Sequence, residues 1–165
     1  MDIVSAKLFT VIFLLHGQSV LMLRRAPWKT FAPNRWTGLG GRVEPHELEN
    51  LGLSARRELF EETDLQPSEV SDLVLRRTLT FFSEDDGLVT LLYFTGDAAT
   101  LRVPTCTEGD LAWIDRVALE SLDVIENTAL VGGFVLDDVD QGADEIQCGV
   151  AVRDFQGRLV DVRFD

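Results

Sequence analysis

Three glutamates near the middle of the chain have the residue type and the spacing that metal chemistry requires. Glu58, Glu61 and Glu62 are three and four positions apart, and residues at that spacing share one face of an α-helix. Like charges on one face repel each other by roughly a few tenths of a kcal/mol, so a positive partner is expected among them. Hard divalent cations such as Mg²⁺ take oxygen ligands and keep contacts with water and substrate phosphates. The spacing therefore predicts metal-assisted chemistry on a phosphate compound.

The loop ahead of this helix carries residues that suit the same purpose. Gly40 and Gly41 form a glycine pair, and Arg57 immediately precedes Glu58. Taken alone, a helix rich in Arg and Glu is most often a solvated amphipathic helix. The joint occurrence of the glycine pair, an upstream glutamate, the Arg-Glu pair and the Glu-Glu pair favours a functional loop and helix instead.

These residues resemble the Nudix box, the signature of the Nudix (MutT-like) hydrolases. That box reads Gly, five residues, Glu, seven residues, Arg-Glu, an aliphatic residue, any residue, Glu-Glu, any residue, Gly and an aliphatic residue. The run from Arg57 to Glu62 matches its helical half, and Asp64 stands where the box has its last glycine. Asp adopts left-handed backbone more readily than most residues, so Asp64 is expected to end the helix.

The first glutamate of the box can be assigned in two ways. Counting forward from Gly41 selects Glu47, whereas counting back from Arg57 selects Glu49, because nine residues rather than seven separate Glu47 from Arg57. Both assignments stay open, and the insertion is expected to lengthen the loop ahead of the helix. The resemblance implies that Arg57 pairs with one of these glutamates and holds the loop against the helix. An i,i+4 contact between Arg57 and Glu61 is compatible with that role.

The resemblance also implies a fold, an activity and a metal site. The fold is expected to be α/β, with an α/β/α sandwich around a mixed β-sheet. Members of the family cleave a diphosphate linked to another moiety, commonly a nucleoside. Glu58, Glu61 and Glu62 are expected to hold one or more Mg²⁺ ions, with Mn²⁺ as a substitute, together with the backbone carbonyl of Gly40. Glu58, Glu61 and Arg57 are accordingly candidates for catalytic roles.

A further acidic residue is expected on a loop before a later strand. The stretch Thr107–Trp113 resembles the MutT-like nucleotide-pool enzymes, which carry a glutamate five residues ahead of a tryptophan. Glu108 stands at that position and is the candidate for a fourth metal ligand or for the general base. Glu58 is an equal candidate for the base. Clustered carboxylates titrate together, so the choice between them stays open.

Two stretches bear on the substrate. Residues 34–41 and 108–113 look like those of oxidised-purine triphosphatases such as 8-oxo-dGTP diphosphatase. Thr37 stands where the relatives that read the purine have asparagine, and their later paired aspartates have no clean match in residues 122–127. The chain is expected to be a Mg-dependent pyrophosphohydrolase that converts a nucleoside triphosphate to the monophosphate and pyrophosphate. The candidate substrate-binding residues are Arg24, Arg35, Trp36 and Thr37.

Several aromatic side chains could stack on a base. Trp28, Phe31 and Trp36 lie in the predicted loop 25–37, and base stacking is worth ~1–3 kcal/mol per base. Phe81 and Phe82 are expected in the core instead, because they belong to a predicted strand.

Two alternative functions differ from this expectation. One is a Nudix hydrolase of ADP-ribose, a nucleotide sugar or a dinucleotide. The other is a catalytically silent, nucleotide-sensing Nudix module. Such modules usually lose box glutamates, and this chain keeps all three on its helix.

The whole chain limits the other classes of function. Its 165 residues fit one domain, 1–165, and its net charge of −13 argues against polymeric nucleic acid as a partner. No apolar run reaches the ~20 residues of a membrane span. Cys106 and Cys148 have no metal-ligand spacing, which favours reduced thiols in a cytoplasmic protein. A small nucleotide is the expected partner of a monomer or homodimer. The acidic run 137–140 is interpreted as aiding solubility.

Hydrophobic patterns and turn residues predict the elements that position these groups. Strands are expected at 8–15, 20–24, 73–82, 88–95 and 112–114, a second helix at 127–136, and a C-terminal hairpin at about 147–164. The sequence does not decide whether that hairpin is peripheral to the main sheet or contributes to a dimer contact.

Overall fold

The computed structural model describes residues 5–103 and 105–165. Two α-helices, α1 (Leu51–Thr63) and α2 (Glu126–Gln141), accompany the short 3-10 helices η1 (Pro45–Glu47), η2 (Pro67–Glu69) and η3 (Arg116–Ser121). The strands are β1 (Ala6–His16), β2 (Ser19–Arg25), β3 (Trp36–Thr37), β4 (Val70–Ser83), β5 (Gly87–Ala98), β6 (Gly109–Asp115), β7 (Gln147–Arg153) and β8 (Leu159–Phe164). Each predicted strand and the second helix is present, mostly with longer bounds.

The described strands form one mixed, eight-stranded sheet. Its order is β3-β2-β1-β5-β4-β7-β8. β1 and β3 pair with successive parts of one side of β2, and β6 pairs along the other side. The β1–β5 and β4–β7 pairs are parallel, and the other named pairs are antiparallel. The C-terminal hairpin therefore extends the main sheet beyond β4 rather than standing apart from it.

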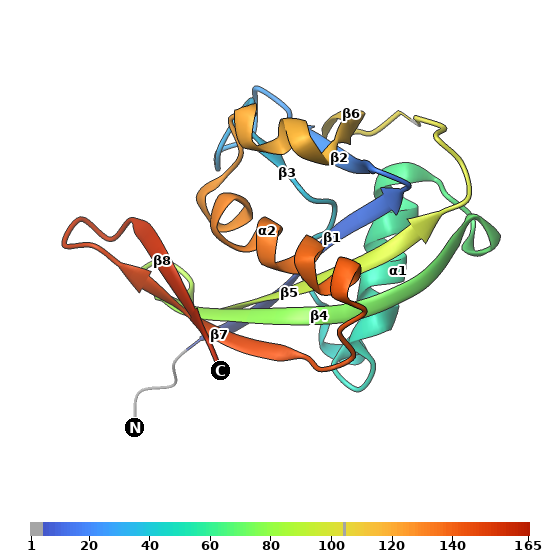
Figure 1. Ribbon diagram of the computed structural model, residues 1–165. Coiled ribbons are helices and arrows are strands. Elements are labelled where there is room, and N and C mark those ends of the chain that lie inside the picture. The colour runs from blue at the N-terminus through green and yellow to red at the C-terminus, as the bar shows by residue number, and fades with distance from the viewer. Residues whose placement is uncertain (1–4, 104) are drawn as a thin grey trace.

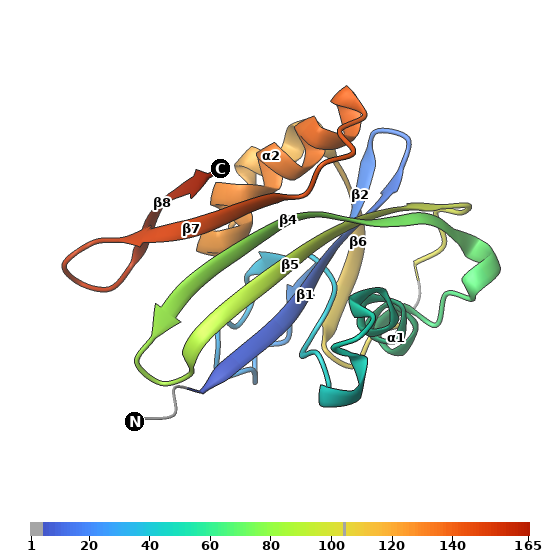
Figure 2. The same ribbon diagram turned by 90° about the horizontal axis from the view of Figure 1, so that it is seen from below.

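The helices cover opposite faces of this sheet, as Figures 1 and 2 show. Strand side chains alternate between the two faces, and they pack into two clusters. Ile12, Leu14 and Leu92 pack on the α1 side with Ala55 and Leu59. Phe13, Leu91 and Tyr93 pack on the α2 side with Val131 and Val135. The expected α/β/α sandwich is confirmed, and the continuous apolar run of β1 reflects a strand that is buried on both faces.

Two expectations about single residues are wrong. Asp138 lies within α2, is buried, and accepts two hydrogen bonds from Arg77 of β4 at 2.6 and 2.7 Å. One residue of the acidic run 137–140 therefore forms a structural ion pair, so the run does not serve solubility alone. Phe82 is 58% exposed, because it lies near the end of β4, where neither cluster includes it.

None of the described helices has both the length and the apolar character that a membrane crossing requires.

Candidate functional site

The glycine pair lies against β1. Thr10 donates its backbone N–H to the Gly41 carbonyl at 2.8 Å, and Leu39 exchanges backbone hydrogen bonds with Ile12. Gly40 has φ 131°, and a Cβ there would clash with the Thr10 carbonyl. A Cβ on Gly41 would come within 2.5 Å of the Glu58 carboxylate. Glycine is thus required at position 40, where the backbone of β1 leaves no room for a Cβ, whereas a side chain at position 41 would displace the Glu58 carboxylate.

Arg57 joins this loop to α1. Its guanidinium donates to both carboxylate oxygens of Glu47, at 2.7 and 3.0 Å, and to the Arg42 carbonyl at 2.9 Å. Glu47 is only 3% exposed, and the Arg57 guanidinium lowers the pKa of Glu47 to about 2. Glu49 is exposed. The structure therefore selects Glu47 as the loop partner of Arg57, and the insertion lies between η1 and α1.

The same guanidinium reaches two of the helix carboxylates. One terminal nitrogen of Arg57 donates to Glu58 at 2.7 Å and to Glu61 at 3.2 Å. The i,i+4 contact with Glu61 therefore coexists with the contact to the loop, as the sequence allowed. The Glu58 side chain is 13% exposed and that of Glu61 is 56% exposed. Glu58 and Glu61 are thus oriented by a residue that is itself fixed by Glu47.

Glu62 is the most buried of the three helix carboxylates. It is 7% exposed and accepts a hydrogen bond of 2.7 Å from the Gly40 backbone N–H. Burial raises the pKa of Glu62 to about 8, and the negative charges of Glu58 and Glu108 act in the same direction. Burial also raises the pKa of Glu58. A cluster of carboxylates out of water and close to one another disfavours its own charged form.

Glu108 approaches this cluster from another part of the chain. It immediately precedes β6, and its carbonyl accepts the Ala26 N–H at 2.9 Å. Its carboxylate forms an ion pair with Lys29. Both charges act on Glu62, since Glu108 raises its pKa and Lys29 lowers it. The structure therefore brings Glu108 to the helix carboxylates, together with a lysine that sequence reasoning missed.

The loop that carries Lys29 exposes two aromatic rings. Trp28 is 73% exposed and Phe31 is 60% exposed. Arg25 holds the loop, because it donates to the Phe31 carbonyl at 2.8 Å and lies 5.5 Å from the centre of the Phe31 ring. The sequence signalled this loop by its aromatic residues and by its length, which is typical of functional loops in compact domains, but it gave no sign of Lys29.

The chemistry of these groups fits a hard divalent cation. All the candidate donors are carboxylate or carbonyl oxygens, and a cation would offset the desolvation of Glu62. In the arrangement described, Arg57 and Lys29 hold the other carboxylates. Across residues 5–103 and 105–165, no three His, Cys, Asp or Glu side chains converge as a set of metal ligands. Metal binding would therefore require Glu58, Glu61 or Glu108 to exchange a basic partner for the ion.

The candidate substrate-binding residues are neighbours on β2, on β3 and just ahead of β3, with Arg24 paired to Trp36, but each contacts other groups of the protein. Arg24 donates to the Asn34 carbonyl at 3.2 Å. Arg35 pairs with Asp123 and Glu126, at 3.0 and 2.8 Å, so its charge is balanced within the protein. Trp36 is partly buried against the α2-side cluster. Thr37 is buried, with its hydroxyl 3.4 Å from that of Thr128 on α2.

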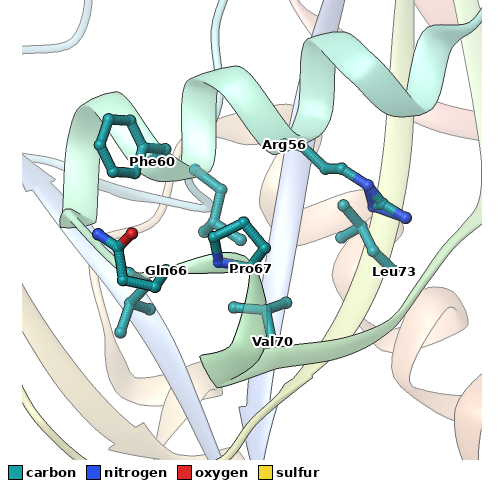
Figure 3. Close-up of a pocket in the computed structure, with 8 residues that line it drawn as sticks. Arg56, Phe60, Gln66, Pro67, Val70 and Leu73 are labelled. Atoms are coloured by element: carbon teal, nitrogen blue, oxygen red, sulfur yellow. The ribbon is translucent and has the colours of Figure 1, made fainter.

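A cavity of about 280 Å³ lies beside α1 but belongs to a different flank of that helix. Arg56 and Phe60 line it from α1, and Gln66, Pro67, Val70 and Leu73 line it from η2 and β4, as Figure 3 shows. Residues 56 and 60 lie one helical turn apart, on the side of α1 away from Glu58 and Glu61. This cavity is therefore separate from the carboxylate site.

Comparison with known proteins identifies the family. The model of the NUDIX domain matches residues 7–135. A MutT protein from Bacillus halodurans is 19% identical, with 96% of this chain and 97% of that chain covered and a TM-score of 0.65.

Two other solved structures are similar. The Nudix hydrolase RenU from M. Smegmatis is 21% identical, with 85% and 86% of the two chains covered and a TM-score of 0.59. The NUDIX domain of Shewanella oneidensis NrtR, complexed with ADP ribose, is 16% identical, with 87% and 91% covered and a TM-score of 0.60. At these identities the solved structures show the fold alone.

No curated protein sequence matches the chain. The family model, however, covers most of it, including β1, β2, the glycine pair and the carboxylates of α1. The chain therefore belongs to the Nudix hydrolases, enzymes that act on phosphoric anhydrides.

Proposed function

We propose that the protein is a Mg²⁺-dependent pyrophosphohydrolase, which converts a nucleoside triphosphate to the monophosphate and pyrophosphate. The observation that carries the proposal is the placement of Glu62. This carboxylate is buried beside the Gly40 N–H, and the charges of Glu58 and Glu108 act on it. Burial of a carboxylate beside other negative charges costs stability unless a positive charge compensates it. The burial of Glu62 therefore supports a site that a cation completes.

Glu58, Glu61, Glu62 and Glu108, with the Gly40 carbonyl, are the groups proposed to hold the metal. A bound Mg²⁺ would neutralise charge that develops on phosphoryl oxygens and lower the pKa of a coordinated water. The chain itself supplies orientation: Arg57 fixes Glu58 and Glu61 relative to the glycine loop. Glu58 and Glu108 both remain candidates for the group that accepts the proton of the attacking water.

The loop from Ala26 to Asn34 is the proposed place for the nucleotide. Trp28 and Phe31 expose aromatic faces on which a base can stack. Lys29 extends from the same loop to Glu108, so its ammonium lies where an anionic phosphate chain would approach the carboxylates. A base on this loop and phosphates at α1 are consistent with a nucleotide substrate.

Selection of an oxidised purine has less support. The Thr37 hydroxyl lies next to Thr128, and the Asn127 amide donates to the Tyr93 hydroxyl at 3.2 Å. Both side chains are buried, so neither offers a group to an incoming base. The proposal therefore names a nucleoside triphosphate, with 8-oxo-dGTP as one member of the class.

A linked diphosphate is the second candidate. Its support is the likeness in fold to the NrtR domain, which was solved with ADP ribose. The carboxylate site would serve either substrate, since both contain a diphosphate bridge. A cytoplasmic location is part of the same proposal, because Cys106 and Cys148 are both free thiols.

The test is the release of pyrophosphate and phosphate from a panel of compounds, with Mg²⁺ and with EDTA. The panel contains dGTP, 8-oxo-dGTP, the other nucleoside triphosphates, ADP-ribose and a diadenosine polyphosphate. We expect metal-dependent pyrophosphate from the triphosphates. Activity restricted to ADP-ribose or the dinucleotide would select the second candidate, and binding without turnover would select a nucleotide sensor.

Matched variants connect that activity to the site. Glu61→Gln and Glu62→Gln remove one charge each without changing the size of the side chain, and both are expected to lose nearly all turnover. Glu49→Gln makes the same change on the exposed glutamate that has no contact with Arg57, and wild-type turnover is expected. Full activity in both Glu61→Gln and Glu62→Gln would contradict the assignment.

A further inference from the structure

Strand β8 forms one end of the sheet. It pairs with β7 on one side, and no other described strand pairs with it. The β7–β8 hairpin lies at the far end of the sheet from α1, as Figure 2 shows. α2 packs on one face of β8 through Phe134 and Phe164, whose rings lie 5.4 Å apart. The edge of β8 is therefore open to another strand, although one of its faces is covered.

The pairing with β7 determines which backbone groups point to the open edge. Asp165 donates its N–H to the Cys148 carbonyl at 3.1 Å. The register is regular from Val152↔Asp161 to Gly149↔Phe164, and alternate residues of an antiparallel strand bond the same neighbour. Asp161 and Arg163 therefore also bond β7, whereas Val162 and Phe164 direct their N–H and C=O groups outward. Consistently, the Val162 N–H takes a side-chain acceptor, the Asp161 carboxylate, at 2.8 Å.

Two exposed side chains of β8 have opposite charges and lie two residues apart. Asp161 and Arg163 are both exposed and flank Val162. Among the described residues, Arg163 has no ion-pair partner. Residues two apart on a strand share one face of the sheet. The edge therefore presents one negative and one positive side chain, placed symmetrically about a residue with outward backbone groups.

We propose that β8 pairs antiparallel with β8 of a second copy of this chain, about a twofold axis at Val162, so that two sheets become one. In this register Val162 faces Val162 of the partner subunit, and the two residues exchange backbone hydrogen bonds. Asp161 of each copy faces Arg163 of the partner subunit, and Arg163 faces Asp161 of the partner subunit. Two identical ion pairs form, because a twofold axis repeats every contact.

The neighbouring registers are less favourable. A shift by one residue would set an outward-facing N–H opposite a residue whose own groups bond β7. A twofold axis at Asp161 would set two aspartates opposite each other, and an axis at Arg163 would set two arginines opposite each other. Like charges directly opposite destabilise a strand pair. Charge and hydrogen bonding thus select the same register.

Apolar surface on the hairpin supports the same contact. Val160 on β8 is 50% exposed, and in the proposed register it faces Phe164 of the partner subunit. Pairing would remove part of this surface from water. The Asp161 carboxylate would leave the Val162 N–H when a backbone carbonyl of the second copy replaces it. Loss of this local bond is offset by the ion pair with Arg163 of the partner subunit.

The test is sedimentation velocity of the full chain and of charge variants. Wild type is expected to be a dimer. Asp161→Arg sets arginines against arginines, and Arg163→Asp sets aspartates against aspartates, so each variant alone should dissociate more readily, by on the order of tenfold or more in the dissociation constant. An equimolar mixture of the two variants should form a heterodimer, because each aspartate then faces an arginine. The double variant Asp161→Arg/Arg163→Asp should also recover the dimer.

Glu120→Arg is the matched control for Asp161→Arg, because it makes the same change in net charge at an exposed residue of η3. It should sediment as wild type does. Circular dichroism of each variant establishes that the fold persists. A monomeric wild type at every attainable concentration would overturn the proposal. Dimers of unchanged affinity in both single variants would also overturn it, because the copies would then meet through another surface.

Discussion

Arg57 binds Glu47 through two parallel hydrogen bonds, Nε to Oε1 at 2.7 Å and Nη2 to Oε2 at 3.0 Å. This paired geometry is specific to the planar guanidinium. The same guanidinium also contacts Glu58 and Glu61. The position of the helix carboxylates relative to the glycine loop therefore depends on one buried glutamate that lies outside the helix.

The first prediction concerns Glu47 and its neighbour Glu49. Glu47→Gln should lower kcat by on the order of 100-fold, because small displacements of catalytic groups have effects of that size. Glu49→Gln, an identical change two residues away on an exposed side chain, should leave kcat unchanged. Steady-state kinetics with a saturating triphosphate checks both. Equal losses in the two variants would show that the loop as a whole matters and that the Arg57 contact does not.

The low pKa of Glu47 predicts how stability changes in acid. The Arg57 guanidinium lowers the pKa of Glu47 from 4.5 to about 2. Because the folded-state pKa is the lower one, the charged form stabilises the fold above pH 4.5, and this contribution is lost as the pH falls toward 2. Denaturant unfolding of wild type between pH 6 and 3 should show a decrease in stability that is smaller in Glu47→Gln. Parallel pH profiles for the two proteins would disprove the linkage.

The raised pKa of Glu62 predicts the opposite dependence in the metal-free protein. Burial raises the pKa of Glu62 from 4.5 to about 8, so the folded state binds the proton more tightly than the unfolded state. That stabilisation is complete below pH 4.5 and is lost as the pH rises through 8. In EDTA, Glu62→Gln should therefore be more stable than wild type at pH 9, by on the order of a few kcal/mol.

Two comparisons control for this effect. Glu61→Gln changes an exposed carboxylate and should show little difference between pH 6 and pH 9. Addition of Mg²⁺ at pH 9 should stabilise wild type more than Glu62→Gln, because the ion would offset the buried charge. A stability difference between Glu62→Gln and wild type that is constant with pH would rule out Glu62 as the titrating group.

Lys29 is expected to act on phosphate binding. Lys29→Met removes the cation that pairs with Glu108 and should raise the KM for a triphosphate by about tenfold, the effect of losing one charge-assisted hydrogen bond. Lys7→Met is the matched control, because Lys7 pairs with Asp86 near the β4–β5 turn. Calorimetric titration of Mg²⁺ without nucleotide should give equal or tighter binding in Lys29→Met. Weaker metal binding in that variant would contradict the role.

The Arg77–Asp138 pair is expected to support stability and not activity. Both side chains are nearly buried, at 11% and 9% exposure, so removing one partner leaves an uncompensated charge. Asp138→Asn should destabilise the fold by about 3–5 kcal/mol, measured by denaturant unfolding. Asp137→Asn, at the exposed neighbouring position, should change stability by less than about 0.5 kcal/mol. KM and kcat should be unchanged in both variants below the unfolding transition.

The sequence alone determined the features that depend on local geometry. Glu58, Glu61 and Glu62 belong to one helix because their spacing follows its period. That helix ends at Asp64, which has a left-handed backbone with φ 54°. Apolar runs bounded by short turns were enough to locate most of the strands, because the side-chain pattern of a strand is local. The short strand β3 (Trp36–Thr37) was missed, because it lies in the predicted loop 25–37 and forms only by pairing with β2.

Only the tertiary structure decided the contacts between distant segments. The spacing of residues along the chain does not distinguish Glu47 from Glu49 as the partner of Arg57. In the structure, Glu47 is the one that is buried against Arg57. Lys29 reaches Glu108 across 79 positions, because β2 and β6 are neighbours in the sheet. Asp138 meets Arg77 because α2 lies over β4. The order of the strands brings these residues together, and that order results from packing of the whole chain, which no local pattern records.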